Sequence, residues 1–364
     1  MKNVCFVIVL FLAFIGCVYA STGDMLIKAD PGAKIEYSTP TWSPKGNSIA
    51  YVAMPSCGEI AFGEKGKNIW LATLKGGKWN HKLLLKDADY PVWSPDGKKL
   101  AIARDGLSIL TLATGKISRL TKDYIPSSDA EDEVKITIDQ PISFSPNGKY
   151  LAYHRSLWEV DETRIFDMVL GKDTGLRVGR YPEWSSDSKY MLSAFNWFMD
   201  CPVPTRLIRT DIKSRKSNTV LSNYRIEGIT WPGASKYAWV LLGKLLPENS
   251  GTDLKPPYGV GIYKLDTKTG SLTKIVSVRM ESLYWSPDNK QFAFLSKLAM
   301  NASDVPKINL YVGNMQNWYF KSVAKDAATP SYNWNEQVRH ASWSQDCHSI
   351  AYVTQSGDIR ILKL

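Results

Sequence analysis

The sequence predicts an all-β protein, a seven-bladed β-propeller whose ring is closed by an N-terminal strand added to the last blade. Three observations support this fold class. One aromatic-plus-turn motif occurs seven times along the chain. Each copy except the last is followed by further strand-like runs that complete a set of four. The last copy is one strand short, and a spare strand-like run precedes the first copy.

The first element is an apolar run that we exclude from the fold. Lys2 precedes an apolar stretch over residues 4–18, and Ala20 is a small residue before Ser21. This order is typical of a secretory signal peptide, and the stretch is too short for a comfortable membrane span. We therefore expect a signal peptide over residues 1–20 with cleavage near Ala20, a single propeller domain over residues 21–364, and a periplasmic or secreted protein.

Residues 14–17 also resemble a bacterial lipoprotein cleavage box. A lipid anchor at Cys17 is therefore the alternative to a plain signal peptide, which we favour. No second long apolar segment follows, so we expect no transmembrane segment.

Each copy of the motif centres on an aromatic anchor that ends one strand and begins a tight reversal. In the copy that begins at Trp93, Pro95 presets the backbone angle of the turn, Asp96 can bond back to the backbone and Gly97 tolerates a positive φ. An alternating apolar strand follows, so each copy predicts a β-hairpin. The anchors recur 40 to 58 residues apart and are Trp42, Trp93, Phe144, Trp184, Trp231, Trp285 and Trp343.

Two more strand-like runs follow the hairpin of each copy before the last, for example residues 107–112 and 117–121 after Trp93. Four short antiparallel strands form one propeller blade, and blades must stack around an axis to bury both of their faces. Only residues 349–354 and 359–364 remain after the last anchor strand, so we expect residues 25–29 to supply the missing outer strand. The fifth copy is the weakest, because Trp231 is followed by Pro-Gly without the usual turn residues.

Composition argues against several other functions. The net charge is +10, but the basic residues are scattered over turns such as 97–99 and 213–216 without one dense patch, so we expect a solvated surface and no nucleic-acid partner. Cys57, Cys201 and Cys347 remain after cleavage; this odd number excludes a disulfide framework but leaves one bridge open. No spacing suits a metal site, and we expect no metal, no cofactor and a monomer.

The motif resembles the WSPDG repeat of TolB-type propellers, which residues 93–97 match fully and residues 285–288 match nearly so. The resemblance covers the whole chain after the signal peptide, although the α/β domain that precedes the TolB propeller has no counterpart here. Related repeats build the propellers of prolyl-oligopeptidase-like proteases and of oligogalacturonate lyases. This chain has no GxSxG nucleophile elbow. The lyases look like enzymes that hold a metal with several histidines inside the propeller. The four histidines of this chain form no recognisable cluster of that kind; they are His81, His154, His340 and His348.

A polar column four residues before each anchor is the best candidate for a binding site. The anchor strand is otherwise apolar, and these residues are expected to ring the mouth of the channel on the face with the long loops. The column contains Ser38, Asp89, Gln140, Arg180, Glu227, Glu281 and Arg339. Aromatic residues in the long loops are expected to rim the same opening, notably Trp158, Trp197, Tyr258 and Trp334. The alternatives are a water-filled channel with mutually paired charges, and aromatics that only pin their own loops.

These features favour a non-enzymatic binding or scaffold protein for a protein, peptide or glycan in the cell envelope. The alternative is a polysaccharide lyase or glycoside-acting enzyme with carboxylates at the channel mouth. An enzyme needs acid and base groups that converge in one pocket, whereas a binding protein needs a charged and aromatic surface. The sequence identifies no catalytic residue.

Overall fold

The structure is a computed structural model of the 364-residue chain. It describes residues 24–28, 35–55, 66–123, 137–157, 161–195, 206–231, 235–243, 260–277, 280, 282–297, 308–328 and 340–364. These residues form β-strands and turns, without a helix among them. Consequently no described helix is long and apolar enough to cross a membrane. The predicted signal peptide and the lipid-anchor alternative at Cys17 lie outside the described residues.

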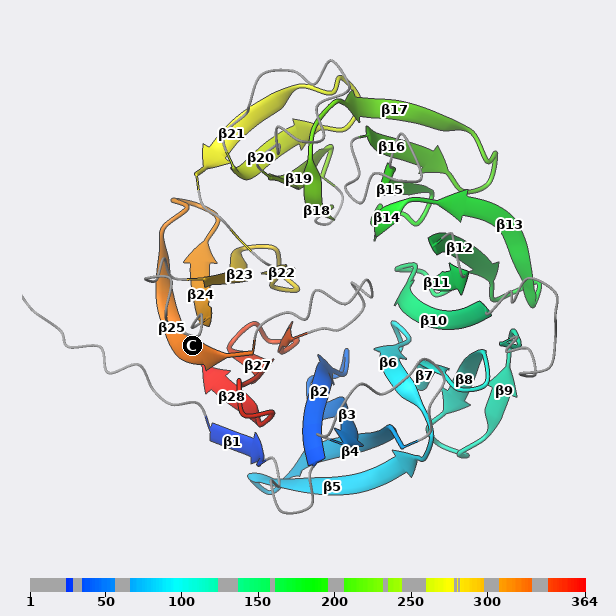
Figure 1. The fold of residues 1–364 in the computed structure, drawn as a ribbon, viewed down its shortest axis with the longest axis vertical. Helices are drawn as coiled ribbons and strands as arrows, with labels where there is room; N and C mark the ends of the chain where they lie inside the picture. Colours follow the sequence, from blue (N-terminus) through cyan, green and yellow to red (C-terminus); the bar gives the residue numbers. More distant parts are fainter. Residues whose placement is uncertain are drawn as a thin grey trace, which may run out of the picture.

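The strands form seven four-stranded sheets around a central axis, as predicted (Figure 1). Within each sheet the strands are antiparallel, and the first strand lies nearest the axis. Blade one comprises β2 (Ile35–Trp42), β3 (Ser48–Pro55), β4 (Asn68–Lys75) and β5 (Lys78–Leu85). Blade two comprises β6 (Asp89–Trp93), β7 (Lys99–Ala103), β8 (Leu107–Thr111) and β9 (Ile117–Arg119). Blade three comprises β10 (Thr137–Phe144), β11 (Tyr150–Leu157), β12 (Asp161–Asp167) and β13 (Lys172–Val178).

The remaining blades follow the same order. Blade four comprises β14 (Arg180–Trp184), β15 (Tyr190–Phe195), β16 (Arg206–Asp211) and β17 (Ser217–Ser222). Blade five comprises β18 (Ile226–Thr230), β19 (Tyr237–Leu242), β20 (Gly261–Asp266) and β21 (Leu272–Val276), so the weakest motif copy still forms a complete blade. Blade six comprises β22 (Ser282–Trp285), β23 (Gln291–Lys297), β24 (Ile308–Asn314) and β25 (Phe320–Ala327). Blade seven comprises β26 (Ala341–Trp343), β27 (Ser349–Val353), β28 (Ile359–Lys363) and β1 (Asp24–Ile27).

The N-terminal strand closes the ring as the sequence predicts. β1 pairs antiparallel with β28, and Asp24 lies opposite Ile361. Leu26 is buried and packs against Ile359 and Ile361, which joins the two ends of the propeller through apolar contact as well as backbone hydrogen bonds. The strand begins one residue earlier than expected, and its predicted last residue, Ala29, lies outside the described residues.

The turn chemistry explains why the first hairpins of five blades share one set of contacts. In blade two the Ser94 hydroxyl donates to the Asp96 carboxylate (2.6 Å), and the backbone N–H groups of Lys98 and Lys99 donate to Asp96 and Ser94 (3.0 and 2.9 Å). Gly97 has a φ of 65°, the left-handed conformation that glycine adopts without strain. A serine followed two residues later by Asp or Asn makes the same contacts in blades three, four, six and seven.

Several of the aromatic anchors join neighbouring blades. The indole N–H of Trp93 donates to the Thr41 carbonyl (3.0 Å), and that of Trp343 donates to the Tyr284 carbonyl (3.1 Å), each in the preceding blade. Trp184 makes the equivalent bond to the hydroxyl of Ser143 (3.2 Å). Trp184 and Trp343 are buried, whereas Trp93 is only half-buried. At these three positions the aromatic column therefore joins adjacent blades, whereas the Trp231 indole donates to the Ser235 carbonyl in its own blade.

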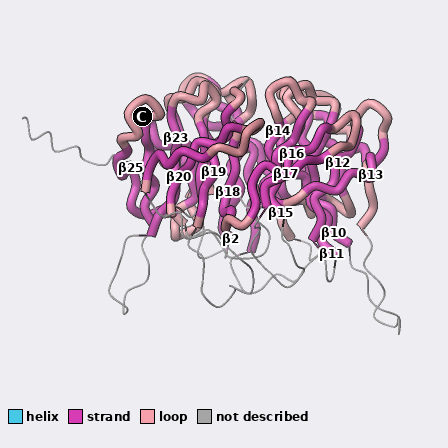
Figure 2. Tube along the Cα trace, turned by 90° about the horizontal axis from the view of Figure 1, so that it is seen from above, coloured by secondary structure: helices cyan, strands magenta, loops and turns pink. Residues whose placement is uncertain are grey.

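The two ends of the ring differ in their connections. We call the turn face the end that carries the connections between first and second strands and between third and fourth strands; these turns lie along one side of the ring in Figure 2. We call the opposite end the loop face, where second strands connect to third strands and each blade connects to the next. The first strands therefore begin at the loop face and end, at their anchors, at the turn face.

Candidate binding site at the channel mouth

The structure describes five members of the predicted polar column. They lie on the innermost strands β2, β6, β10, β14 and β18, in the halves of these strands toward the loop face, and are Ser38, Asp89, Gln140, Arg180 and Glu227. Glu281 and Arg339 lie outside the described residues, as do the predicted rim aromatics Trp158, Trp197, Tyr258 and Trp334. A ligand-binding role for the column and the rim stays a prediction.

A β-bulge follows the polar residue in blades one, two and four. Thr39, Tyr90 and Tyr181 have φ angles of 46°, 52° and 52°, and a proline follows each of them. In blade two Asp89 pairs with Ala103 and Val92 with Ala101, so two residues of the inner strand oppose one residue of its neighbour. Positive φ costs a non-glycine residue about 1–3 kcal/mol and is concentrated at functional sites. Sequence reasoning missed these bulges.

In blades three and five the inner strand is irregular at the same level. The register shifts between Pro141 and Ser143 in blade three and between Ile226 and Gly228 in blade five. Glu227 is itself the extra residue in blade five. All five inner strands whose polar-column residue is described are thus irregular at this level, which redirects the side chains beside the channel.

The Asp89 carboxylate is held in place by its neighbours. Its Oδ2 accepts from the Lys67 ammonium at 2.7 Å, and its Oδ1 accepts from the backbone N–H of Tyr90 at 2.7 Å. The same ammonium lies 5.7 Å from the centre of the Tyr90 ring. Lys67, Asp89 and the strained bulge therefore form one rigid unit at the start of β6, and the partner of Asp89 lies outside the polar column.

Glu227 is fixed in a similar way. Its Oε1 accepts from Nε of Arg225 at 2.8 Å, and both side chains are about a quarter exposed. Gly243, at the end of β19, leaves room for the carboxylate: a Cβ at this position would lie 2.0 Å from Oε1. The Gly243 N–H also donates to the Arg225 carbonyl (3.1 Å). Because Gly243 has no side chain, the Glu227 carboxylate can lie beside it and accept from Arg225.

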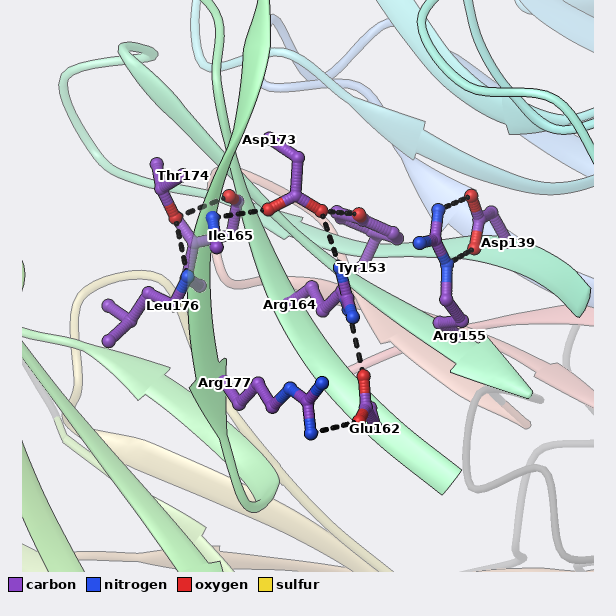
Figure 3. A network of polar contacts seen from close by, with 11 residues as sticks. Asp139, Tyr153, Arg155, Glu162, Arg164, Ile165, Asp173, Thr174, Leu176 and Arg177 are labelled. Carbon is purple, nitrogen blue, oxygen red and sulfur yellow. Dashed lines mark hydrogen bonds and ion pairs between the residues drawn. The ribbon is translucent and has the colours of Figure 1, made fainter. Parts of the chain in front are cut away.

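Blade three carries a buried polar network behind the column (Figure 3). Asp139 is fully buried and accepts two hydrogen bonds from the Arg155 guanidinium, at 2.7 and 2.6 Å. Its backbone N–H donates to the Asp123 carboxylate (2.9 Å). Burial raises the pKa of Asp123 from 3.8 to about 6, and the negative charge of Asp139 contributes to this rise. Next to Asp139 in the sequence, Gln140 is 3% exposed, and its Oε1 has no hydrogen-bond partner among the residues that the structure describes.

The network continues to the outer strand of the blade. The Tyr153 hydroxyl donates to Asp173, which also accepts from Arg164 at 3.3 Å (Figure 3). Glu162 accepts from Arg164 and from Arg177, each at 2.8 Å. Together with Asp139 and Arg155, these contacts involve three acidic and three basic side chains of blade three. The acidic ones are Asp139, Glu162 and Asp173, and the basic ones are Arg155, Arg164 and Arg177. This balance is typical of a structural ion network and leaves little net charge for a ligand.

A cavity of about 290 Å³ lies between the inner strands of blades three and four. Glu183 and Ser143 contribute polar groups to it, beside aromatic surface. Its lining residues are Ile142, Ser143, Phe144, Pro146, Pro182, Glu183 and Trp184. The cavity lies near the anchors rather than at the polar column.

The histidines are dispersed over the fold. His81 lies on the outer strand β5, His154 on β11, His340 just before β26, and His348 in a turn. Burial lowers the pKa of His340 to about 4, so this side chain is neutral at physiological pH. Within the described ranges, no three His, Cys, Asp or Glu side chains gather as a metal site would need. Cys347 is buried and free, whereas Cys57 and Cys201 lie outside the described residues.

Comparisons with known proteins agree on the fold. No protein-family model and no curated protein matches the chain. An oligogalacturonate lyase in complex with manganese is similar, with a TM-score of 0.65 and 15% identity over 93% of this chain and 92% of that one. The β-propeller domain of the trilobed protease from Pyrococcus furiosus has a TM-score of 0.53 and 14% identity over 90% of this chain and 91% of that one. A putative TolB from Agrobacterium tumefaciens also matches, at 16% identity and a TM-score of 0.46 over 78% of this chain and 95% of that one.

The chain has a β-propeller fold, which it shares with the lyase and the protease propeller. At these identities the likeness concerns the fold and does not transfer an activity. The protease propeller is described as having an open velcro topology. The present chain differs from that description, because β1 and β28 pair and close its ring.

Proposed function

We propose that the protein is a non-enzymatic binding or scaffold protein that recognises a protein, peptide or glycan at the channel mouth on the loop face. The observation that carries the proposal is the strained bulge that follows the polar residue in blades one, two and four. A strained backbone conformation persists only where the surrounding structure holds it in place, and such conformations are concentrated at functional sites. Non-glycine residues in the turns at the other end also have positive φ, among them Ser188, Asn289 and Cys347, but they occupy the turn position that Gly97 fills in blade two. Thr39, Tyr90 and Tyr181 differ because they lie inside an inner strand.

The charges at the mouth support recognition rather than catalysis. The two described carboxylates of the column, Asp89 and Glu227, are each held by a cation at 2.7 and 2.8 Å. A carboxylate in such a pair is a fixed hydrogen-bond acceptor, and a ring of fixed polar groups can read the shape and charge of a ligand. The apolar leader at residues 4–18 supports placing this activity in the cell envelope or outside the cell.

The experiment compares ligand capture by matched variants of the chain. The immobilised protein is exposed to an envelope extract and, in parallel, to a glycan array. Glu227→Ala combined with Glu281→Ala should abolish capture while the thermal melt stays unchanged. Asn80→Ala combined with Lys82→Ala, on the exposed outer strand β5, is the control and should capture like wild type. Equal capture by the Glu double variant and wild type would exclude the mouth as the binding site.

Gly243→Ala gives a second, independent variant. The added methyl group cannot share space with the Glu227 carboxylate, which must move away from Arg225. Capture should weaken without removal of any polar group.

The second candidate is a polysaccharide lyase or glycoside-acting enzyme, favoured by the likeness to the oligogalacturonate lyase over 93% of the chain. The test is incubation with polygalacturonate, with and without added manganese, followed by the ultraviolet absorbance of an unsaturated product. A signal that Glu227→Ala removes would replace the binding proposal with this one.

A further inference from the structure

The turn face gathers positive charge that looks scattered in the sequence. Its described connections contain eleven exposed Lys or Arg residues and four Asp residues, a formal charge of +7 when His348 is neutral, against +10 for the whole chain. The basic residues that are scattered over turns in the sequence thus share one face of the ring, where they remain exposed to solvent. The cations are Lys45, Lys98, Lys116, Lys149, Lys189, Lys213, Arg215, Lys216, Lys236, Lys268 and Lys290.

The repeat itself produces much of this charge. Five residues after the anchor, blades two to six all carry a lysine, and blade seven carries His348. In blades two, four and six the backbone N–H of that lysine donates to the Asp of its own turn, at 3.0 to 3.1 Å. The turn therefore uses the backbone of the lysine and leaves its side chain largely exposed, in five of the seven blades. The Lys189 and Lys290 ammonium groups also lie 3.4 and 3.8 Å from the Asp carboxylates of their own turns.

The four Asp residues within these connections are already engaged by their own turns. Each accepts a serine hydroxyl at 2.6 to 2.7 Å as well as a backbone N–H. Asp167, Asp211 and Asp266, which end third strands beside this face, likewise accept backbone N–H groups of their turns. They are structural members of the hairpins, and a partner that approaches the face meets mainly the ammonium groups beyond them.

Exposed apolar side chains lie on the same face. In the described part of the chain, the large apolar or aromatic residues that are exposed number five. Val169 and Leu170 (70% and 66% exposed) form the tip of the β12–β13 hairpin, and Tyr319 (69%) lies in the β24–β25 hairpin. Leu74 lies beside the β4–β5 turn. Leu364 follows β28, and the Leu364 N–H donates to the His348 carbonyl. None of the five lies on the loop face.

We propose that the turn face is a docking surface for an anionic lipid bilayer. Cations attract acidic headgroups, and apolar tips at the level of the lysines can enter the boundary between headgroups and acyl chains. A soluble polyanion would need the charges but not the exposed apolar tips, and so the two observations together favour a membrane. The first strands would then point their loop-face ends, with the polar column, away from the bilayer.

The test measures sedimentation with lipid vesicles. Residues 24–364 contain every strand of the closed ring, so the chain from Ser21 is used, which also removes the apolar leader. Binding is expected to vesicles of equal parts phosphatidylglycerol and phosphatidylcholine, and not to phosphatidylcholine alone. It should disappear in about 1 M salt, where the screening length is about 3 Å. Equal binding to both kinds of vesicle would overturn the proposal.

Matched variants locate the surface. Each lysine near an anionic membrane contributes roughly fivefold to binding, so Lys213→Gln with Lys216→Gln should weaken it about thirtyfold. Val169→Ser with Leu170→Ser should weaken it without a change of charge. Lys86→Gln with Lys122→Gln, exposed on the loop face, should change it by less than about twofold because of charge screening.

Two results would exclude the assignment. If the loop-face variant lost binding as strongly as the turn-face variant, net charge rather than this surface would be responsible. If the chain bound soluble polygalacturonate in a way that depends on Lys213 and Lys216, but bound no vesicles, the partner would be a polysaccharide and not a membrane.

Discussion

Replacing Asp123 by Asn should stabilise the protein above pH 6 and have little effect near pH 4. The carboxylate accepts a hydrogen bond from the Asp139 N–H (2.9 Å), and burial raises its pKa from 3.8 to about 6. Asn keeps the acceptor oxygen and removes the charge. The variant therefore isolates the cost of an ionised carboxylate between blades two and three.

The sign follows from proton binding. Native Asp123 keeps its proton up to about pH 6, whereas the unfolded chain releases it near 3.8. Because the native state binds more protons between these values, stability falls as pH rises through this window. About two pKa units correspond to about 3 kcal/mol at ~1.36 kcal/mol per unit. The carboxyl is only partly buried, so solvent screening reduces the gain of the Asn variant to about 1–2 kcal/mol.

The assay is urea unfolding followed by tryptophan fluorescence at about pH 4 and about pH 8. Asp96→Asn is the control, because the Ser94 hydroxyl lowers the pKa of Asp96 and gives its charge the opposite effect. Asp96→Asn should not stabilise the protein at the higher pH. If Asp123→Asn gave no gain at the higher pH, or the same gain at both, the electrostatic explanation would be wrong.

Two further predictions concern the closure and the anchors. Leu26→Ala should lower the free energy of unfolding by about 2–5 kcal/mol, because Leu26 is buried against β28; the exposed Lys28→Ala should leave the urea midpoint unchanged. Trp343→Ala should cost about 3–5 kcal/mol, because the ring is 6% exposed and bonds the preceding blade, whereas Trp343→Phe should cost less. Calorimetric melts would check both anchor variants, and an Ala variant as stable as wild type would remove Trp343 from the packing role.

The blades could be predicted because their information is local and repeated. Ser94, Pro95, Asp96 and Gly97 specify one turn whatever surrounds them, and the structure shows the hydrogen bonds that this sequence implies. Closure could be predicted by counting, since one strand was missing at one end and available at the other. Even the fifth blade forms without the usual turn residues, because β18 to β21 still bury Ile226, Val240 and Leu265.

The details of the candidate site could not be predicted in the same way. The pairing of Asp89 with Lys67 joins the start of one blade to the residue just before the third strand of the previous blade, across 22 residues. The strain at Tyr90 depends on how β6 pairs with β7, and nothing in Tyr-Pro alone specifies a positive φ. A position in the polar column was predictable, whereas the partner of each member depended on the tertiary structure.

The two faces use the repeat in opposite ways, and this bears on what each can bind. On the turn face most blades present the same lysine, so the charges add over a wide area without selecting one shape, which suits an extended partner. On the loop face the corresponding column varies from blade to blade: its five described members carry four different chemical groups, the hydroxyl of Ser38, the carboxylates of Asp89 and Glu227, the amide of Gln140 and the guanidinium of Arg180. A ring of unlike groups held by ion pairs and strained bulges can discriminate between ligands, because a wrong partner leaves some of them unsatisfied. Non-selective attachment and selective recognition therefore belong at opposite ends of the same blades.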